Sequence, residues 1–318
     1  MKADKRKLLA KVAYMYYEQE LTQAQIAKEL SIYRTTVSRM LSQAKAEGIV
    51  EVKINFFDAH LFELEEQLKE IFGLQAVELV ATDKAMTEEQ KEYQLAQAAG
   101  TYIRRQLTDE MVVGLSWGAS VGNAINQIEA KQVSDITVVP VVGGPSHINS
   151  QYHVNTLVYE LARKLNGQSL FVNATVIQEN KALAEGIFNS KYFQELRNYW
   201  DRLDLVVVGV GGPLSYQKSQ WRDLLSPIDY EELKLREAVG DCCCRFYDRY
   251  GKRLNGSLNQ RTIGLSLDQL VKVPQTIGVA RGITKAKSIA PLLEKGYLKT
   301  LITDQETAEE ILRLMKRK

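Results

Sequence analysis

Residues 21–54 constrain the fold of this chain most, because they hold two short helical patterns separated by only three residues. The two apolar faces have helical spacing and consist of Ile26, Ala27 and Leu30, and then Val37, Met40, Leu41 and Ala44. Thr22, followed three residues later by Gln25, has the pattern of a capping box at a helix start. The segment Ser31-Ile32-Tyr33 has room only for a tight turn. The pattern therefore predicts a helix-turn-helix.

The start of the second helix carries side chains that suit contacts with DNA. Hydroxyl, guanidinium and amide groups donate hydrogen bonds to base edges and phosphates. An ordinary helical hairpin with a polar surface is the alternative interpretation. Gly48 is expected to end this helix, and the alternation over residues 49–54 predicts a wing strand. The candidate DNA-binding residues are Thr22, Gln23, Tyr33, Arg34, Thr35, Thr36, Ser38 and Arg39.

The charge of the chain is divided unequally. Residues 1–54 contain ten Lys and Arg against six Asp and Glu, so this end carries +4 within a total of +2. A leading helix over residues 5–19 is expected to pack on the helix-turn-helix, and its basic residues suit phosphate contacts. We expect a DNA-binding domain at 1–54 and a second domain at 55–318. The apolar residues assigned to this packing are Leu8, Leu9, Val12, Ala13 and Tyr16, and the basic ones are Lys5, Arg6, Lys7 and Lys11.

Composition excludes several classes of protein. The chain has 318 residues, 45% of them hydrophobic and 25% charged, which is ordinary for a globular protein. No apolar run approaches the roughly 20 residues of a membrane span, and the charged N-terminus lacks a signal-peptide cleavage pattern. We therefore expect a cytoplasmic protein. The adjacent Cys242, Cys243 and Cys244 are expected on a buried strand, where they would have no metal or redox role.

Beyond Gly73, short apolar runs alternate with helical patterns. Such alternation predicts an α/β fold with a doubly wound, mostly parallel sheet covered on both faces. The expected strands are 76–81, 111–115, 136–142, 169–172, 205–209, 276–280 and 300–303. The expected helices are 59–72, 88–106, 119–129, 153–165, 192–200, 230–238, 284–295 and 305–316. The helix at 59–72 is a candidate for subunit contacts, with ordinary packing on the second domain as the alternative.

Four of these strands end in glycine-rich turns. In open α/β sheets ligands bind outside the carboxyl ends of the strands, where glycine lets the backbone approach a ligand and N–H groups attract anions. One such turn is weak support, but four in one sheet predict a site for a small polar ligand, phosphorylated or not. The turns are Gly114-Leu-Ser116-Trp117-Gly118, Gly143-Gly144-Pro145-Ser146, Gly209-Val-Gly211-Gly212-Pro213, and Gly278-Val-Ala-Arg281-Gly282 with Lys285 following.

Other polar residues near these turns have two interpretations each. Asp241 and Arg245 could bind sugar hydroxyls or an anion, or could form a salt bridge at a strand end. His153 and Asn155 could reach a ligand on the second turn, or His153 could be a half-buried structural residue. Lys285 would oppose the dipole of the helix it opens, which favours a bound anion beside it.

Gly114-Leu-Ser116-Trp117-Gly118 also fits the nucleophile elbow of α/β-hydrolases. A hydrolase needs a histidine late in the chain, but the three histidines are His60, His147 and His153. Only two follow Ser116, and both come directly after the next strand. We therefore expect Ser116 and its loop to donate hydrogen bonds to a ligand.

The chain resembles the SorC/DeoR family of bacterial sugar-responsive transcription regulators almost from end to end, and within it regulators of sorbose operons. The segments that carry the resemblance are LTQAQIAKEL, SIYRTTVSRML, GLSWG, PVVGGPS, QYHVNTLVYELA, GVGGP, VGDCCCRFYD, GVARG-ITKA and LITDQETAEEIL. The family implies a helix-turn-helix joined to a domain similar to the phosphosugar isomerase, deaminase and CoA-transferase fold, used for sensing. It also implies a tetramer built as a dimer of dimers.

By this resemblance the chain binds operator DNA and a sugar or sugar-phosphate effector, with sorbose or a derivative expected, and needs no cofactor. Some relatives hold the effector through a lysine Schiff base, but Pro140-Val141-Val142 offers no lysine here, so non-covalent binding is expected. A sugar-phosphate isomerase or deaminase with an appended DNA module is the alternative, and a protein-interaction hairpin at 21–54 is a weaker one. The expected effector-site residues are Ser116, Trp117, Gly118, Gly143, Gly144, Pro145, Ser146, His153, Asn155, Gly211, Gly212, Asp241, Arg245 and Lys285.

Overall fold

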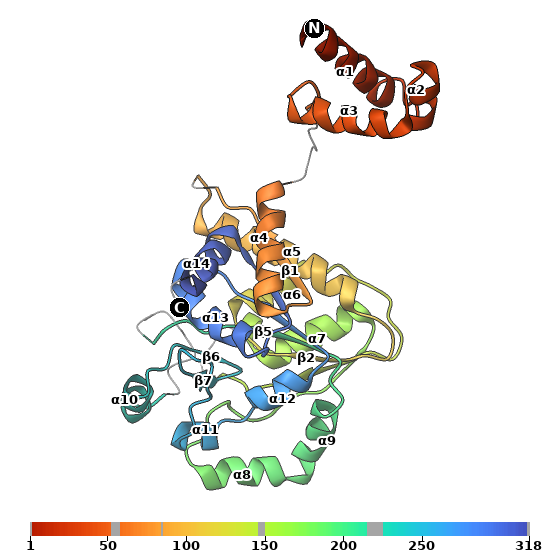
Figure 1. The fold of residues 1–318 in the computed structure, drawn as a ribbon. Helices are drawn as coiled ribbons and strands as arrows, with labels where there is room; N and C mark the ends of the chain where they lie inside the picture. The colour runs from red at the N-terminus through yellow and green to blue at the C-terminus, as the bar shows by residue number, and fades with distance from the viewer. Residues whose placement is uncertain (1, 52–57, 84, 146–149, 215–224, 317–318) are drawn as a thin grey trace. The chain divides into compact units, whose positions relative to one another are not determined.

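The computed structural model describes residues 2–51, 58–83, 85–145, 150–214 and 225–316. It divides into two compact units, Met1–Asp58 and Ala59–Lys318, drawn with their elements in Figure 1. The expected boundary between residues 54 and 55 lies outside the described residues.

The N-terminal unit consists of three helices around its own small core. They are α1 (Lys2–Tyr17), α2 (Gln23–Glu29) and α3 (Arg34–Ala46). The predicted capping box is present, since Thr22 Oγ1 accepts a bond from the Gln25 N–H while Gln25 Oε1 accepts one from the Thr22 N–H. Ser31 adopts a left-handed φ of 51° in the turn between α2 and α3. The main core cluster of this unit contains Val12, Met15, Ile26, Ala27, Val37 and Leu41.

The end of α3 differs from the prediction of a wing. Gly48 has a φ of 67°, its N–H donates to the Lys45 carbonyl, and the Ile49 N–H donates to the Ala44 carbonyl, which together form a Schellman motif. Ile49 and Val50 then pack against Leu9, Ala13 and Ala44. The predicted strand is wrong for residues 49–51, because the apolar side chains close the helix end. Residues 52–54 lie outside the described residues.

The C-terminal unit is built on a seven-stranded sheet of order β1-β9-β8-β5-β2-β3-β4. Every pairing in it is parallel, as the runs of buried apolar residues predicted. All seven expected strands are present, with ends that differ by up to a few residues. The strands are β1 (Ala76–Val80), β2 (Val112–Leu115), β3 (Thr137–Pro140), β4 (Gln168–Ser169), β5 (Leu205–Gly209), β8 (Gln275–Val279) and β9 (Thr300–Asp304).

The chain winds outward in both directions from the middle of this sheet. It runs from edge strand β1 to central β2, and outward through β3 to β4. It then returns to β5 beside β2 and continues through β8 and β9 to lie next to β1. The direction therefore reverses between β2 and β5, which is the topological switch point of the fold. The predicted doubly wound α/β class is confirmed.

Two groups of helices pack on the sheet (Figure 1). Right-handed crossovers place helices of opposite winding on opposite faces. The first group is α5 (Glu88–Gln106), α6 (Ala119–Gln127) and α7 (Val154–Leu165), which contact one another in sequence. The second group is α4 (Ala59–Phe72), α13 (Ala286–Glu294) and α14 (Gln305–Met315), in which α14 contacts both of the others.

The remaining elements belong neither to the seven-stranded sheet nor to these two groups of helices. They are η1 (Ser150–Tyr152), α8 (Lys181–Asn189), α9 (Lys191–Trp200), α10 (Pro227–Leu235), β6 (Gly240–Cys242), β7 (Arg245–Tyr247), α11 (Ser257–Arg261), α12 (Leu267–Lys272) and η3 (Ile283–Lys285). The strands β6 and β7 form an antiparallel hairpin that the sequence patterns did not predict.

The three cysteines occupy this hairpin. Cys242 ends β6, while Cys243 and Cys244 form its two-residue turn with φ values of 50° and 57°. Left-handed φ at both turn residues is the requirement of a type I′ hairpin. The prediction that all three lie on one strand is therefore wrong. All three thiols are buried and reduced, and no cluster suited to a metal occurs among the residues that the structure describes.

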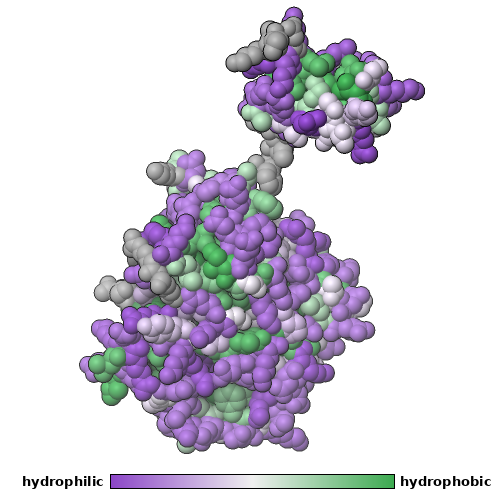
Figure 2. All heavy atoms as spheres, in the orientation of Figure 1, coloured by the Kyte–Doolittle hydropathy of each residue, from purple (hydrophilic) through white to green (hydrophobic). Residues whose placement is uncertain are grey.

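No helix among the described residues is long and apolar enough to cross a membrane. Figure 2 shows a largely hydrophilic surface on the visible face of the C-terminal unit, interrupted by green apolar areas. Large apolar side chains are exposed in both units, and examples are Tyr33 before α3 and Leu235 at the end of α10.

Candidate functional site

The glycine-rich turns meet at the carboxyl edge of the sheet, around the switch point between β2 and β5. Ser116 follows β2, and its buried Oγ accepts a hydrogen bond of 3.2 Å from the N–H of Gly209 at the end of β5. Gly118, with a φ of 120°, is the N-cap of α6 and offers no side-chain oxygen to the helix. The turns after β2 and β5 are thus joined directly, as expected for the ligand-binding edge of an open α/β sheet.

The turn after β3 is attached to the same place. Trp117 Nε1 donates a 2.9 Å hydrogen bond to the Gly143 carbonyl and so ties the β2 and β3 turns together. A Cβ added at Gly143 would lie 2.7 Å from the Thr175 carbonyl oxygen, so only glycine fits there. Pro145 is buried beside it, whereas Ser146 lies outside the described residues.

His153 lies over this turn. A Cβ on Gly144 would approach the imidazole Nε2 to 2.5 Å, so the absence of a side chain makes room for the ring. His153 is the N-cap of α7, and its Nδ1 accepts a bond of 3.2 Å from the Asn155 N–H. Burial lowers the pKa of His153 below its usual 6.5. The ring is then neutral with its proton on Nε2, directed toward Gly144.

The Asn155 side chain bonds to the protein backbone. Its Nδ2 donates to the Val172 carbonyl at 2.9 Å, and its Oδ1 accepts from the Val172 N–H at 3.0 Å. This pair of bonds clamps the segment after β4 to the start of α7. We infer that Asn155 positions His153 and the turn around it.

A second cluster lies beyond β5. The backbone N–H of Gly211 donates to the Asp241 carbonyl at 2.8 Å, and a Cβ on Gly211 would lie 1.9 Å from the Asp241 carboxylate. Asp241 on β6 therefore lies directly against this turn and is buried. A Cβ on Gly212 would lie 3.4 Å from Cγ of Lys285. A carboxylate and an ammonium stem thus approach the same turn from two different elements.

Arg245 does not join this cluster. Its Nε and both terminal nitrogens donate to oxygens of the Leu265, Asn259, Thr262 and Gly264 backbone and the Asn259 side chain. Burial lowers the pKa of Arg245 to about 10, so the guanidinium stays charged at neutral pH. Because these bonds use its five N–H donors, neither of its two predicted partners, a ligand or Asp241, is favoured by the geometry. Arg245 instead ties residues 259–265 to the hairpin.

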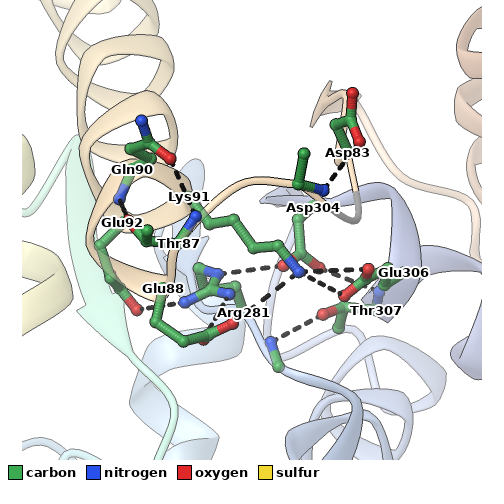
Figure 3. Close-up of polar contacts among 12 residues, drawn as sticks. Asp83, Thr87, Glu88, Gln90, Lys91, Glu92, Arg281, Asp304, Glu306 and Thr307 are labelled. Atoms are coloured by element: carbon green, nitrogen blue, oxygen red, sulfur yellow. Dashed lines mark hydrogen bonds and ion pairs between the residues drawn. The ribbon is translucent and has the colours of Figure 1, made fainter.

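Sequence reasoning placed Arg281 in a turn without giving it a role. The side chain is buried after β8 and donates to Asp304 at 3.0 Å, Glu92 at 2.8 Å and Glu88 at 2.9 Å. Figure 3 shows these bonds and the neighbouring pair of Lys91 with Glu306. Burial alone would lower the pKa of Arg281, but its bonds to the three carboxylates outweigh burial and raise it. No local pattern could have revealed this cluster, because its members come from α5, β8, β9 and α14.

The N-terminal unit presents most of its predicted DNA-contacting residues on one exposed surface. Arg34, Thr35, Ser38 and Arg39 are exposed on the first two turns of α3, and Thr36 is half-buried. Tyr33 precedes them with 83% of its surface exposed. Side chains three and four residues apart share a helix face, so this surface is continuous.

The remaining residues of the unit include one wrong assignment. Thr22 is exposed and Gln23 half-buried at the start of α2. The basic residues Lys5, Arg6, Lys7 and Lys11 are exposed on α1. Leu8, predicted to pack inward, is 42% exposed, and the buried Met15 occupies the core instead.

A helix-turn-helix unit followed by a parallel α/β unit with joined glycine-rich turns defines the class of ligand-responsive DNA-binding proteins. The sequence model described as "Putative sugar-binding domain" matches residues 58–313. The chain is 35% identical over 314 residues to the sorbitol operon regulator of Klebsiella pneumoniae, covering 98% of this chain and 99% of that one. It is 28% identical to the deoxyribonucleoside regulator of Bacillus subtilis, covering 98% and 99%.

Solved structures of similar regulators have the same fold as this chain. The full-length sorbitol operon regulator from K. pneumoniae superposes with a TM-score of 0.77 at 35% identity, covering 96% of this chain and 98% of that chain. A transcriptional regulator from Streptococcus pneumoniae superposes with a TM-score of 0.77 at 41% identity, covering 82% and 98%. The chain therefore belongs to the SorC/DeoR family of sugar-binding transcriptional regulators, and the resemblance read from its motifs is confirmed.

Proposed function

We propose that this regulator of a sugar-utilisation operon binds its effector at the joined turns after β2, β3 and β5. The observation that supports this proposal is the series of contacts that joins the turns. Trp117 bonds to Gly143, Ser116 accepts from Gly209, and Lys285 lies against Gly212. The relative from K. pneumoniae is named for a sorbitol operon, and the motifs of this chain suggested sorbose. A six-carbon sugar or sugar alcohol, free or phosphorylated, is therefore the proposed effector.

Each group in the site has a distinct chemical task. Asp241 accepts hydrogen bonds from sugar hydroxyls, and neutral His153 donates one from Nε2. Lys285 and the backbone N–H groups of the turns suit an anionic oxygen, such as that of a phosphate. β3 ends at Pro140, and Val141 and Val142 follow it, so this position offers no lysine for a Schiff base and non-covalent binding is proposed. The proposed contacts are Ser116, Trp117, Gly118, Gly143, Gly144, Pro145, Ser146, His153, Gly211, Gly212, Asp241 and Lys285.

Thermal shift of the full chain tests the effector site. D-Sorbitol, L-sorbose and their monophosphates are titrated, because a ligand that binds only the folded state adds about 2.7 kcal/mol of stability at a hundred times its Kd. We expect one of them to raise Tm. In Asp241→Asn or Lys285→Met, the ligand concentration needed for the same rise in Tm should increase at least tenfold. Arg163→Gln, which removes an exposed ion pair on α7, is the matched control. If no compound raises Tm, the effector site is wrong.

We infer that the domain senses its ligand and does not convert it. His153 Nδ1 accepts the Asn155 N–H, and its Nε2 carries the proton, so neither ring nitrogen is placed to act as a general base toward Ser116 or a ligand. Incubation with ketose and aldose phosphates provides the check. Turnover that Asp241→Asn abolishes would establish the isomerase or deaminase alternative.

The N-terminal unit is proposed to bind operator DNA as part of a homotetramer arranged as a dimer of dimers. Paired helix-turn-helix units read half-sites separated by whole helical turns. Effector binding would shift the population between two arrangements of these units, with a coupling that is reciprocal. Sedimentation of the free protein and of its operator complex tests the assembly, and a monomer in both would contradict it.

A further inference from the structure

We propose that Arg281 and the first turn of α14 form a junction that transmits changes at the effector loop to the start of α4. The effector loop is defined as residues 281–285. The proposal rests on the proposed function for the meaning of that loop, but its first test needs no effector.

The effector loop is fixed at its beginning by a buried cation. The Arg281 guanidinium bridges Asp304, which ends β9, and the two glutamates Glu88 and Glu92 on the first turns of α5 (Figure 3). Its side chain is only 7% exposed, and that of Asp304 is 1% exposed. A buried, hydrogen-bonded ion pair has defined geometry, because losing one partner leaves a charge without compensation. The position of Arg281 is thus set by β9 and α5 together.

The same loop is bonded to α14 through its backbone. The Gly282 N–H donates to Thr307 Oγ1 at 2.7 Å, and the Thr307 N–H donates to Asp304 Oδ1 at 2.9 Å. Asp304 is the N-cap of α14, and Lys91 on α5 pairs with Glu306 at 3.1 Å. The first turn of α14 therefore binds the effector loop through a hydrogen bond and α5 through an ion pair.

The first turn of α14 is connected in turn to α4. Glu309 Oε1 accepts from Gln305 Nε2 at 2.8 Å and lies 3.3 Å from Nε2 of His60, in the first turn of α4. Further along, Leu64 and Leu68 of α4 are buried in one apolar cluster with Ile311 and Leu312 of α14. Both His60 and Glu309 are about half exposed, so their contact is weak and sensitive to small shifts.

The first residues of α14 therefore contact both the effector loop, through Thr307, and the first turn of α4, through Glu309. α4 begins at Ala59, the first residue after the N-terminal unit. A contiguous set of contacts is a physical route for coupling only if both ends respond to the same element. The experiment therefore substitutes residues of the junction and measures hydrogen exchange at the start of α4.

Hydrogen exchange of the full chain without ligand provides the first test. The variants are Thr307→Val, which removes the hydroxyl acceptor at nearly constant volume, and Arg281→Gln. The matched control is Arg253→Gln, which removes an ion pair with Asp268 elsewhere in the unit. We expect faster exchange in residues 281–286 and also, by several-fold, in residues 63–66, whose N–H groups bond the first turn of α4. The control should leave both segments unchanged.

Exchange that rises at the effector loop but stays at the wild-type rate in residues 63–66 would overturn the proposal. If Arg281→Gln does not fold, Thr307→Val decides alone. A second measurement uses whichever sugar or sugar phosphate raises Tm. Thr307→Val should keep its affinity for that compound within threefold while the change in operator affinity that the compound causes falls by at least threefold. Failure of the thermal-shift screen would contradict the effector site and leave the exchange result valid.

Discussion

At the scale of single residues, Arg245 has a predicted effect on stability that can be measured. Its five donors are met by protein oxygens within residues 259–265. Lysine has a single donor nitrogen and cannot reach the same set. We expect Arg245→Lys to lower the free energy of unfolding by about 3 kcal/mol, since several buried carbonyls lose a partner. Urea unfolding measures this loss.

The control for Arg245→Lys is Arg249→Lys, an arginine that stacks on Tyr250 near the surface. We expect it to change stability by less than about 0.5 kcal/mol, as surface substitutions usually do. An equal effect of the two substitutions would contradict the structural role assigned to Arg245.

His153 gives the stability of the C-terminal unit a pH dependence. Burial lowers its pKa from the usual 6.5, so the unfolded chain takes up the proton first as pH falls. The contribution of neutral His153 is fully present above about pH 6.5 and is lost as pH falls below that value toward the folded pKa. Urea unfolding at pH 7.5 and 5.5 should show a larger loss for wild type than for His153→Asn.

The His153→Asn variant keeps an acceptor at the N-cap of α7 and removes the titrating imidazole. A loss between the two pH values that is identical in both proteins would show that His153 does not titrate as described.

Residue types alone predicted only part of the arrangement at the strand ends. The glycines and Ser116 could be proposed as ligand contacts because their positions after strands carry information about the backbone. The role of Arg245 could not be, since an arginine in a sequence does not reveal which oxygens surround it. Arg281 was missed for a related reason: Glu88, Glu92 and Asp304 are far from it in the chain and meet only in the folded unit.

At the scale of elements, α3 carries the surface that we propose contacts operator DNA. Arg34→Ala and Arg39→Ala should each weaken operator binding by 1–3 kcal/mol, or roughly 5- to 150-fold, if they contact bases. Both side chains are exposed, so folding should be unaffected. Electrophoretic mobility shifts at fixed salt, with circular dichroism of each variant, provide the measurement.

Arg163→Ala removes one positive charge from the C-terminal unit and is the control for net charge. If it weakens operator binding as much as Arg34→Ala and Arg39→Ala do, the surface on α3 is not the one that reads DNA.

The long helices and the buried parallel strands were predicted well, whereas the β6–β7 hairpin and the wing were not. The helices at 59–72 and 88–106 have the predicted ends because apolar periodicity, and for α5 a capping box, define them. The β6–β7 hairpin was missed because two cysteines replace the Asn-Gly pair that marks such turns. The supposed wing failed because the alternation at Ile49 and Val50 serves to close α3.

At the scale of the whole molecule, the two units have separate cores. The clusters of the N-terminal unit contain residues up to Val50, and the cluster of the C-terminal unit begins at Leu64. A domain of roughly 60 residues has marginal stability on its own. Differential scanning calorimetry should therefore show two transitions, of which Ile26→Ala lowers only the first, with a loss of 2–5 kcal/mol. A single two-state transition in both proteins would contradict independent cores.

The Schellman motif at Gly48 and Ile49 has a consequence for the evolution of such regulators. The motif folds the chain back onto α1, so that Ile49 and Val50 pack against the apolar side chains of the N-terminal unit. Recombination between genes at a point between Val50 and Leu64 would leave the described clusters of both units whole. A family built this way can exchange operators and inducers independently, and a chimaera joined there should keep the DNA preference of one parent and the small-molecule response of the other.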